Sequence, residues 1–174
     1  MLAIPMMVIA LIIKLTSRGP IFFKQKRVGK NGQLFTMYKF RTMRVSSSAE
    51  ADTRWTSEND PRRTRIGTFL RRTSLDELPQ FFNVLKGDMS VVGPRPERPH
   101  FAKKFGQDIA LYQTRHHLNV GITGWAQVKH SRGDASIRKR VRYDLYYLQH
   151  WSLLFDIRII LMTIWGGFMS RNAY

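Results

Sequence analysis

The chain has 174 residues, 43% of them apolar, which suits one compact domain and excludes two large ones. It has no cysteine, which excludes disulfide bonds and thiolate metal sites and is compatible with a cytosolic face. Its 29 lysines and arginines against 12 aspartates and glutamates give a formal net charge of +17. That charge favours a polyanionic partner, such as nucleic acid, an anionic lipid surface or a phosphorylated substrate.

An uncharged apolar segment opens the chain, from residue 2 to residue 13. It is too short to cross a bilayer, because a spanning helix needs roughly 20 apolar residues. It also lacks the charged start and the cleavage site of a signal peptide. A re-entrant or interfacial segment fits best, with Pro5 at the start or at a break of a helix. A buried core helix is the alternative.

A β-hairpin is predicted next. Between Ile21 and Val45, aromatic and β-branched residues flank a turn at residues 29–32, which contains two glycines. Residues 46–64 are rich in Ser, Thr, Asp and Asn and lack periodicity, so we expect an exposed loop there.

Helical spacing predominates in the rest of the chain. Helices are expected from Ile66, from Ser74 to Gly87, and at residues 97–116 and 136–150. Val91 and Val92 predict a short strand, followed by a loop that prolines make rigid. The predicted fold class is therefore α+β, mostly helical with a small sheet.

Residues 151–169 predict a C-terminal helix. Trp151 and Trp165 bracket an apolar stretch that contains Asp156 and Arg158, and these charges argue against a spanning helix. Aromatic residues at both ends, with basic residues nearby, suit a helix that lies in the headgroup region of an anionic leaflet. An amphipathic helix packed on the domain is the alternative.

The segment from Ser74 to Glu77 has two interpretations. Ser74 followed three residues later by Glu77 predicts a capping box, a purely structural feature. However, Arg71 lies just upstream and Arg95 follows in a Pro-Arg-Pro loop. A helix N-terminus beside arginines predicts a phosphate site, where the same cations would keep Asp76 ionised.

Both acidic residues then have chemical roles. An ionised Asp76 beside a bound diphosphate could attack phosphorus as a covalent nucleophile. The adjacent Glu77 could hold a Mg²⁺ ion that bridges phosphate oxygens.

Five motifs in order resemble the bacterial sugar transferase family of monotopic phosphoglycosyl transferases. They are GPIFFKQ at 19–25, YKFRTM at 38–43, RRTSLDELPQ at 71–80, VGPRP at 92–96 and GITGWAQ at 121–127. Together they run over nearly the whole chain, which makes the resemblance far more specific than any single motif would.

The resemblance implies a two-step reaction. Asp76 would take a phosphosugar from a UDP-sugar and release UMP, and polyprenyl (undecaprenyl) phosphate would then attack the aspartyl-phosphosugar. Glu77 would bind the Mg²⁺ cofactor. The matching residues Lys39, Arg41, Arg71 and Arg95 would hold the pair or contact phosphates, and Arg132 and Asp156 also match site positions.

The resemblance also implies a place in the cell: the cytoplasmic face of a bacterial inner membrane, among anionic lipids. Residues 1–18 would be the remnant of a proline-broken re-entrant helix whose first half is missing before Met1. Residues 19–174 would form the catalytic domain, including the C-terminal interfacial helix. A homodimer is left open.

The C-terminal half looks most like members that start exopolysaccharide synthesis from UDP-glucose, so glucose is the first expectation, with galactose and N-acetylated sugars open. Two alternatives compete with the transferase. A nucleic-acid-binding protein would explain the charge, but not the apolar start or the Asp-Glu pair, and we expect no nucleic-acid partner. A non-catalytic membrane scaffold would make Asp76 dispensable.

Overall fold

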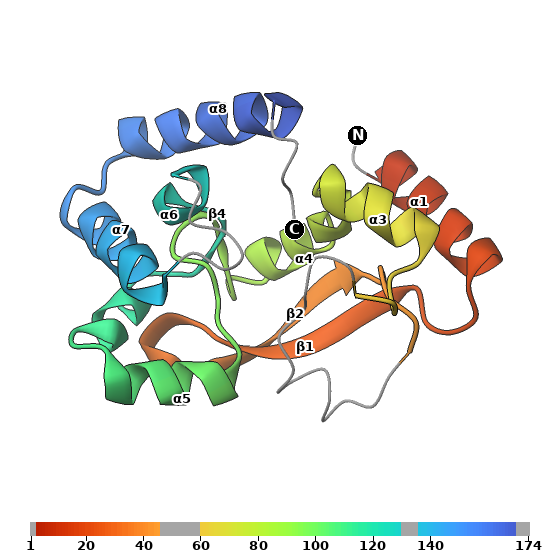
Figure 1. The fold of residues 1–174 in the computed structure, drawn as a ribbon. Helices are drawn as coiled ribbons and strands as arrows, with labels where there is room; N and C mark the ends of the chain where they lie inside the picture. The colour runs from red at the N-terminus through yellow and green to blue at the C-terminus, as the bar shows by residue number, and fades with distance from the viewer. Residues whose placement is uncertain (1–2, 46–59, 130–135, 170–174) are drawn as a thin grey trace.

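The computed structural model describes residues 3–45, 60–129 and 136–169 and has the expected α+β fold, with helices around two small sheets (Figure 1). Its elements, with η for 3₁₀ helices, are α1 (Ala3–Thr16), β1 (Phe22–Val28), η1 (Lys30–Gly32), β2 (Leu34–Phe40), α3 (Arg65–Arg72), η2 (Leu75–Glu77), α4 (Gln80–Leu85), β3 (Ser90–Val92), α5 (Pro99–Asp108), η3 (Tyr112–His116), β4 (Gly121–Thr123), α6 (Trp125–Val128), α7 (Ile137–Gln149) and α8 (Leu153–Met169). The predicted hairpin, the short strand and the helices that became α3, α7 and α8 are confirmed. Strand β4 and helix α6 were not predicted, and most of the predicted loop at 46–64 lies outside the described residues.

The hairpin β1–β2 runs across the lower part of the molecule (Figure 1). Its turn contains Asn31 at φ 52° and Gly32 at φ 78°, which are left-handed conformations that asparagine and glycine adopt most readily. The antiparallel register places Phe23 opposite Lys39 and Gln25 opposite Met37. Because side chains alternate along a strand, these four share one face of the hairpin.

The second sheet pairs β3 with β4 in parallel, and two glycines allow the close approach of the chain beyond β3 to β4. A Cβ atom on Gly121 would lie 2.2 Å from the backbone nitrogen of Gly93, and one on Gly93 would lie 2.3 Å from the backbone oxygen of Asn119. No side chain fits there. The GITG and VGPRP motifs therefore contact each other backbone to backbone.

Replacing Gly121 by alanine should destabilise the protein by about 1–3 kcal/mol, because the added methyl group must push two backbone segments apart. Gly166→Ala is the matched control, since a Cβ atom at Gly166 meets no atom within 4 Å and alanine favours a helix. Chemical denaturation measures both variants. Equal midpoints for the two would contradict the close packing at Gly121.

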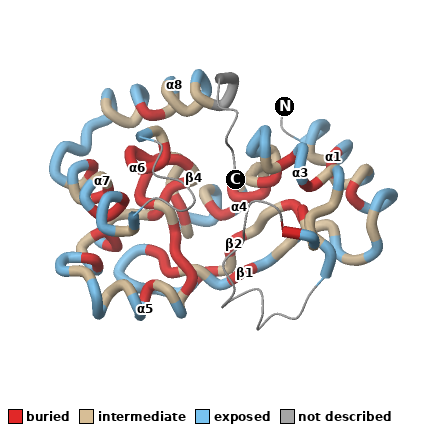
Figure 2. The backbone as a smooth tube through the Cα atoms, in the orientation of Figure 1, coloured by how far each residue is buried: buried red, intermediate tan, exposed pale blue. Residues whose placement is uncertain are grey.

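The terminal helices α1 and α8 each bury one side and expose another (Figure 2). Ile13 and Ile159 are completely buried, and they belong to two different hydrophobic clusters. The alternative interpretation of the C-terminal helix, in which it packs on the domain, is thus supported for one face of α8. Pro5 lies in the first turn of α1, a tolerated position, and α1 is not broken there. Within the described residues, none of the helices has both the length and the apolar character needed to cross a membrane.

Candidate active site

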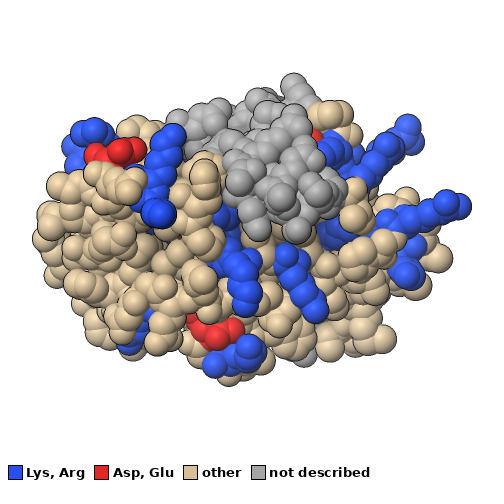
Figure 3. Space-filling model, turned by 90° about the horizontal axis from the view of Figure 1, so that it is seen from below, with Lys and Arg blue, Asp and Glu red and all other residues tan. Residues whose placement is uncertain are grey.

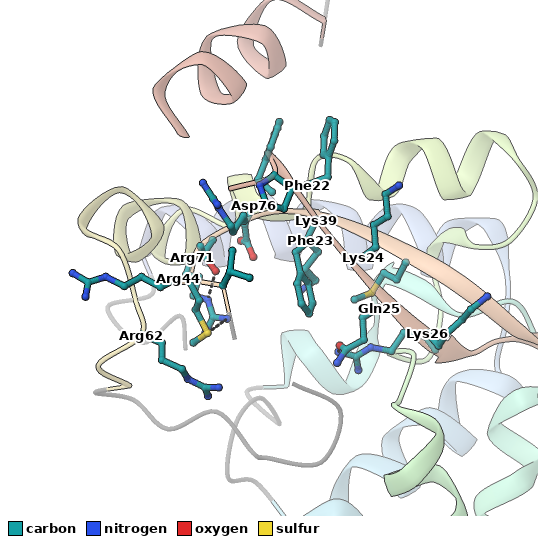
Figure 4. A pocket seen from close by; sticks show the side chains of 18 of the residues that line it. Phe22, Phe23, Lys24, Gln25, Lys26, Lys39, Arg44, Arg62, Arg71 and Asp76 are labelled. Atoms are coloured by element: carbon teal, nitrogen blue, oxygen red, sulfur yellow. Dashed lines mark hydrogen bonds between the residues drawn. The ribbon is translucent and has the colours of Figure 1, made fainter. Parts of the chain in front are cut away.

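A cavity of about 440 Å³ lies on the face of the hairpin that carries Phe23 and Lys39 (Figure 4). Its basic lining residues are Lys24, Lys26, Arg27, Lys39, Arg41, Arg44, Arg62, Arg71 and Arg98. Among the described lining residues, Asp76 is the only acidic one. Lys and Arg also outnumber Asp and Glu on the underside of the molecule (Figure 3). Such a cavity favours an anionic ligand, and phosphate groups above all.

The turn that carries Asp76 and Glu77 is not the predicted helix start. Ser74 has a left-handed conformation, with φ 58°, and its side chain caps nothing. The predicted capping box and the helix predicted to begin at Ser74 are therefore wrong, whereas phosphate binding beside Arg71 and Arg95 stays a prediction. The chain instead makes a left-handed turn at Ser74, and Leu75 and Leu78 pack against the hydrophobic cluster under α1. That cluster consists of Ile9, Ile13, Phe40 and Leu70. A single 3₁₀ turn follows, and α4 begins only at Gln80.

Glu77 is held by two cations from distant parts of the chain. Lys39 Nζ donates to Glu77 Oε1 at 2.6 Å, and a terminal guanidinium nitrogen of Arg95 donates to the same oxygen at 2.8 Å. Burial opposes ionisation of Glu77, but the charges and hydrogen bonds of Arg95 and Lys39 outweigh it and hold its pKa well below the usual value. Glu77 is thus a fixed anion, and its second oxygen makes no hydrogen bond within the described part of the chain.

Asp76 has a different environment, although it is the next residue. Its side chain is buried, with 6% of the residue exposed, and it forms no hydrogen bond with any described residue. Burial raises the pKa of Asp76, while the charges of Lys39, Arg71 and Arg95 act in the opposite direction. The expected effect of the cations is therefore present, but burial outweighs it. A poorly solvated carboxylate without hydrogen bonds is more basic, and its oxygens are free to react.

Two further predicted residues, Arg71 and Arg41, line the cavity, and their guanidinium groups donate hydrogen bonds within the protein. Arg71 Nε donates to Thr42 Oγ1 at 2.9 Å, and the arginine lies beside Asp76 (Figure 4). The guanidinium of Arg41 donates to the backbone oxygens of Ser17 and Arg18, at 2.8 and 2.5 Å. Arg41 therefore fixes the chain that follows α1, and its predicted contact with substrate stays a prediction.

The structure does not bring Asp156 to this cavity. The carboxylate of Asp156 accepts hydrogen bonds from the Tyr147 hydroxyl at 2.7 Å and the Trp151 indole at 3.3 Å, which ties the start of α8 to the end of α7. Arg132, the other predicted site residue, lies outside the described residues.

Several cavity residues were missed by sequence reasoning. Phe23 and Gln25 of β1 point into the cavity, with Phe23 between Asp76 and Gln25 (Figure 4), and Arg27 and Arg98 line it too. For Phe23, Gln25 and Arg27 the sequence did contain a signal, because alternation along the predicted strand places residues 23, 25 and 27 on one face. Only the register shows that this face also carries Lys39.

The family model for bacterial sugar transferases matches residues 1–170. The chain belongs to the bacterial sugar transferase family. Three family motifs meet at the site, since Lys39, the Asp76–Glu77 pair and Arg95 come from YKFRTM, RRTSLDELPQ and VGPRP.

Relatives within the sugar transferase family have different named substrates. The chain is 48% identical over 170 residues to a UDP-glucose:undecaprenyl-phosphate glucose-1-phosphate transferase of Escherichia coli, covering 95% of this chain and 36% of the relative. It is 47% identical to a protein of the same name from Xanthomonas campestris, covering 97% and 36%. It is 44% identical to a UDP-N-acetylgalactosamine-undecaprenyl-phosphate N-acetylgalactosaminephosphotransferase of Aeromonas hydrophila, covering 95% and 40%. The chain thus spans little more than a third of the length of these relatives.

Proposed function

We propose that this protein transfers a sugar 1-phosphate from a UDP-sugar to polyprenyl phosphate and releases UMP. The observation that carries the proposal is the contrast between two adjacent carboxylates, of which Asp76 lines the cation-rich cavity and Glu77 is bound by Lys39 and Arg95. Glu77 is fixed by Lys39 and Arg95, whereas the buried Asp76 makes no hydrogen bond with a described residue. Such a pair supplies one free nucleophile and one fixed anion.

The proposed reaction has two balanced steps. An oxygen of the Asp76 carboxylate attacks the β-phosphorus of the UDP-sugar, the bond from that phosphorus to the bridging oxygen breaks, and UMP leaves. A phosphate oxygen of the polyprenyl phosphate then attacks the same phosphorus, and the bond to Asp76 breaks. Asp76 is regenerated, and the product is a polyprenyl diphosphate sugar. Arg71 and the other cavity cations stabilise the negative charge that develops on the phosphate oxygens.

We also propose that Mg²⁺ acts in this site. The described residues contain no group of three metal-ligating side chains, so a complete protein cage is not present in that part of the chain. Mg²⁺ is commonly held by one or two carboxylates together with substrate phosphates, and the free oxygen of Glu77 fits that requirement. When bound, the ion would neutralise charge on the diphosphate. Lys39 and Arg95 keep Glu77 ionised and so able to bind it.

We further propose that the apolar faces of α1 and α8 lie in the cytoplasmic leaflet of an inner membrane. Helix α8 lies along the top of the molecule, and α1 runs from the top down its right-hand side (Figure 1). Their exposed apolar side chains include Ile4, Met7, Leu11, Leu15, Leu153, Leu154, Leu161 and Trp165. Such faces favour the boundary between headgroups and acyl chains. Leu154→Asp/Leu161→Asp should weaken binding to anionic lipid vesicles about tenfold or more; unchanged co-sedimentation would contradict this placement.

Glucose is the proposed sugar, because the relatives from Escherichia coli and Xanthomonas campestris are named for UDP-glucose. The N-acetylgalactosamine relative is nearly as similar, so the donor has to be measured. The intact mass of the protein, taken after brief exposure to Mg²⁺ and each of several UDP-sugars without a lipid acceptor, tests the donor and the covalent step together.

A hexose phosphate adduct, with one UMP released for each adduct, is the expected result with UDP-glucose. Adding polyprenyl phosphate should then remove the adduct. A folded, detergent-solubilised protein that forms no adduct with any donor would contradict the proposed covalent mechanism. An adduct only with an N-acetylated donor would retain the mechanism and overturn the choice of glucose.

A further inference from the structure

Arg95 lies in a segment whose backbone is fixed by hydrogen bonds from other parts of the chain. Pro94 and Pro96 lack N–H groups, so the segment between β3 and α5 cannot form regular secondary structure through them. Four consecutive carbonyl oxygens instead accept hydrogen bonds from other elements. Pro94 accepts from Gly121 N at 2.9 Å, Arg95 from Arg115 at 2.9 Å, Pro96 from Arg27 at 3.1 Å and Glu97 from Val28 N at 2.9 Å. Three of these four donors, all but Arg27, come from residues outside the cavity lining, and together the four set the position of the Arg95 backbone.

One of these donors belongs to a fully buried ion pair. Arg115 on η3 and Asp144 on α7 have side chains that are only 1% and 2% exposed. Arg115 donates to Asp144 Oδ2 from Nε at 2.9 Å and from a terminal nitrogen at 2.7 Å, and that terminal nitrogen also donates to the Arg95 backbone oxygen. The Tyr112 hydroxyl accepts from the other terminal nitrogen at 3.2 Å. The guanidinium plane is therefore fixed on every side.

Stability alone gives little reason for this pair. Removing two charges from water is costly, and replacing a buried ion pair by apolar residues of similar volume is often neutral or stabilising. What an apolar pair cannot do is donate to the Arg95 carbonyl. A planar guanidinium held by Asp144 can, and its direction is fixed.

We propose that Arg115 and Asp144 are positioning residues for the active site. Asp144 orients Arg115, and Arg115 holds the backbone of Arg95 at the place from which the Arg95 side chain reaches Glu77. A continuous chain of contacts thus runs from α7 through η3 and the Pro-Arg-Pro segment to the Asp-Glu pair. The role in turnover rests on the proposed function, whereas the effect on Arg95 does not.

The paired replacement Arg115→Met/Asp144→Leu tests this proposal in the full-length protein. The variant should remain folded, with an unfolding temperature near that of the wild type. Its kcat should fall about 10- to 100-fold, because a displacement of about 1 Å in a catalytic group can cost about that much. The KM for UDP-glucose should stay within about threefold, since Arg115 and Asp144 lie outside the cavity lining.

Combining this replacement with Arg95→Gln separates positioning from a general loss of packing. If Arg115 acts through Arg95, the paired replacement should lower kcat less than about twofold once Arg95 is absent. The same loss in both backgrounds would overturn the proposal. Val141→Ala, a buried change one turn away on α7, is the control for lost packing and should leave kcat within about twofold.

A second measurement does not depend on catalysis. The side-chain ¹⁵N–¹H signals of Arg95 should be protected from exchange in the wild type by the bond to Glu77. They should lose at least about tenfold protection in the Arg115→Met/Asp144→Leu variant. Unchanged protection in the variant would overturn the proposal, whether or not the protein turns over a UDP-sugar. If the variant loses protection but the wild type turns over no UDP-sugar, only the proposed function is contradicted.

Discussion

Asp76→Asn should abolish the covalent adduct and lower turnover at least about a thousandfold, because the amide cannot attack phosphorus. The fold should be as stable as the wild type or more stable. Burial raises the pKa of Asp76, so its ionised form is unfavourable in the folded protein, and asparagine removes that charge. Intact mass, UMP release and thermal unfolding measure these three effects.

The pH dependence of Asp76 has a defined sign. Because the folded-state pKa of Asp76 is raised, its carboxyl group lowers the stability of the wild type as pH rises above the ordinary value of 3.8. The uncharged side chain of the asparagine variant makes no such contribution. The stability difference in favour of Asp76→Asn should therefore be larger at pH 7 than at pH 3. Adduct formation by the wild type should decline with acid at a pH above 3.8, as Asp76 becomes protonated.

Asp108→Asn, an exposed change at the end of α5, controls for the loss of one negative charge and should keep full activity. A non-catalytic scaffold makes a different prediction, since Asp76→Asn would then change nothing measurable. An adduct that persists in the Asp76→Asn variant would instead assign the nucleophile to another residue.

Glu77→Gln should have the opposite effect on stability. The change removes the anion between Lys39 and Arg95 and leaves two cations close together in a largely buried site, at a cost of about 3 kcal/mol. Turnover should fall as well. If Glu77 holds Mg²⁺, the concentration of the ion that gives half-maximal turnover should rise at least about tenfold.

The pH dependence of Glu77 is also opposite in sign. Lys39 and Arg95 lower its pKa against the effect of burial, so its contribution to stability is complete above the ordinary value of 4.5 and is lost as pH falls toward the folded-state value. Denaturation at pH 7 and at pH 3 measures the difference in the free energy of unfolding between Glu77→Gln and the wild type. That difference should be smaller at pH 3.

Lys86→Gln breaks an ion pair whose lysine is 63% exposed and should change stability by less than about 1 kcal/mol at either pH. A Glu77→Gln variant as stable as this control would contradict a stabilising role for the two contacts of Glu77.

Local patterns were enough to predict most elements. Alternation and two glycines predicted the hairpin around residues 29–32, and helical spacing predicted α3, α7 and α8, because these features depend on residues close in sequence. The turn at Ser74 was mispredicted for the same reason. Its local sequence favours a capping box, but packing of Leu75 and Leu78 on the hydrophobic cluster under α1 favours a left-handed turn.

The buried charges were also hidden from sequence reasoning. Residues 138–142 resemble a solvated basic run, yet Arg140 is 7% exposed and pairs with Glu97, and Asp144 two residues beyond pairs with Arg115. Nothing in a single sequence distinguishes a buried guanidinium from an exposed one, because its burial depends on partners 29 or 43 residues away.

By itself, the sequence determined the family, the fold class and the Asp76–Glu77 pair, because ordered motifs and local periodicity are properties of neighbouring residues. Only the tertiary structure decided how the two acids differ. Lys39 comes from β2 and Arg95 from the segment after β3, and both bind Glu77 while burial raises the pKa of Asp76. The distinction depends on distance and desolvation, which exist only once the chain has folded.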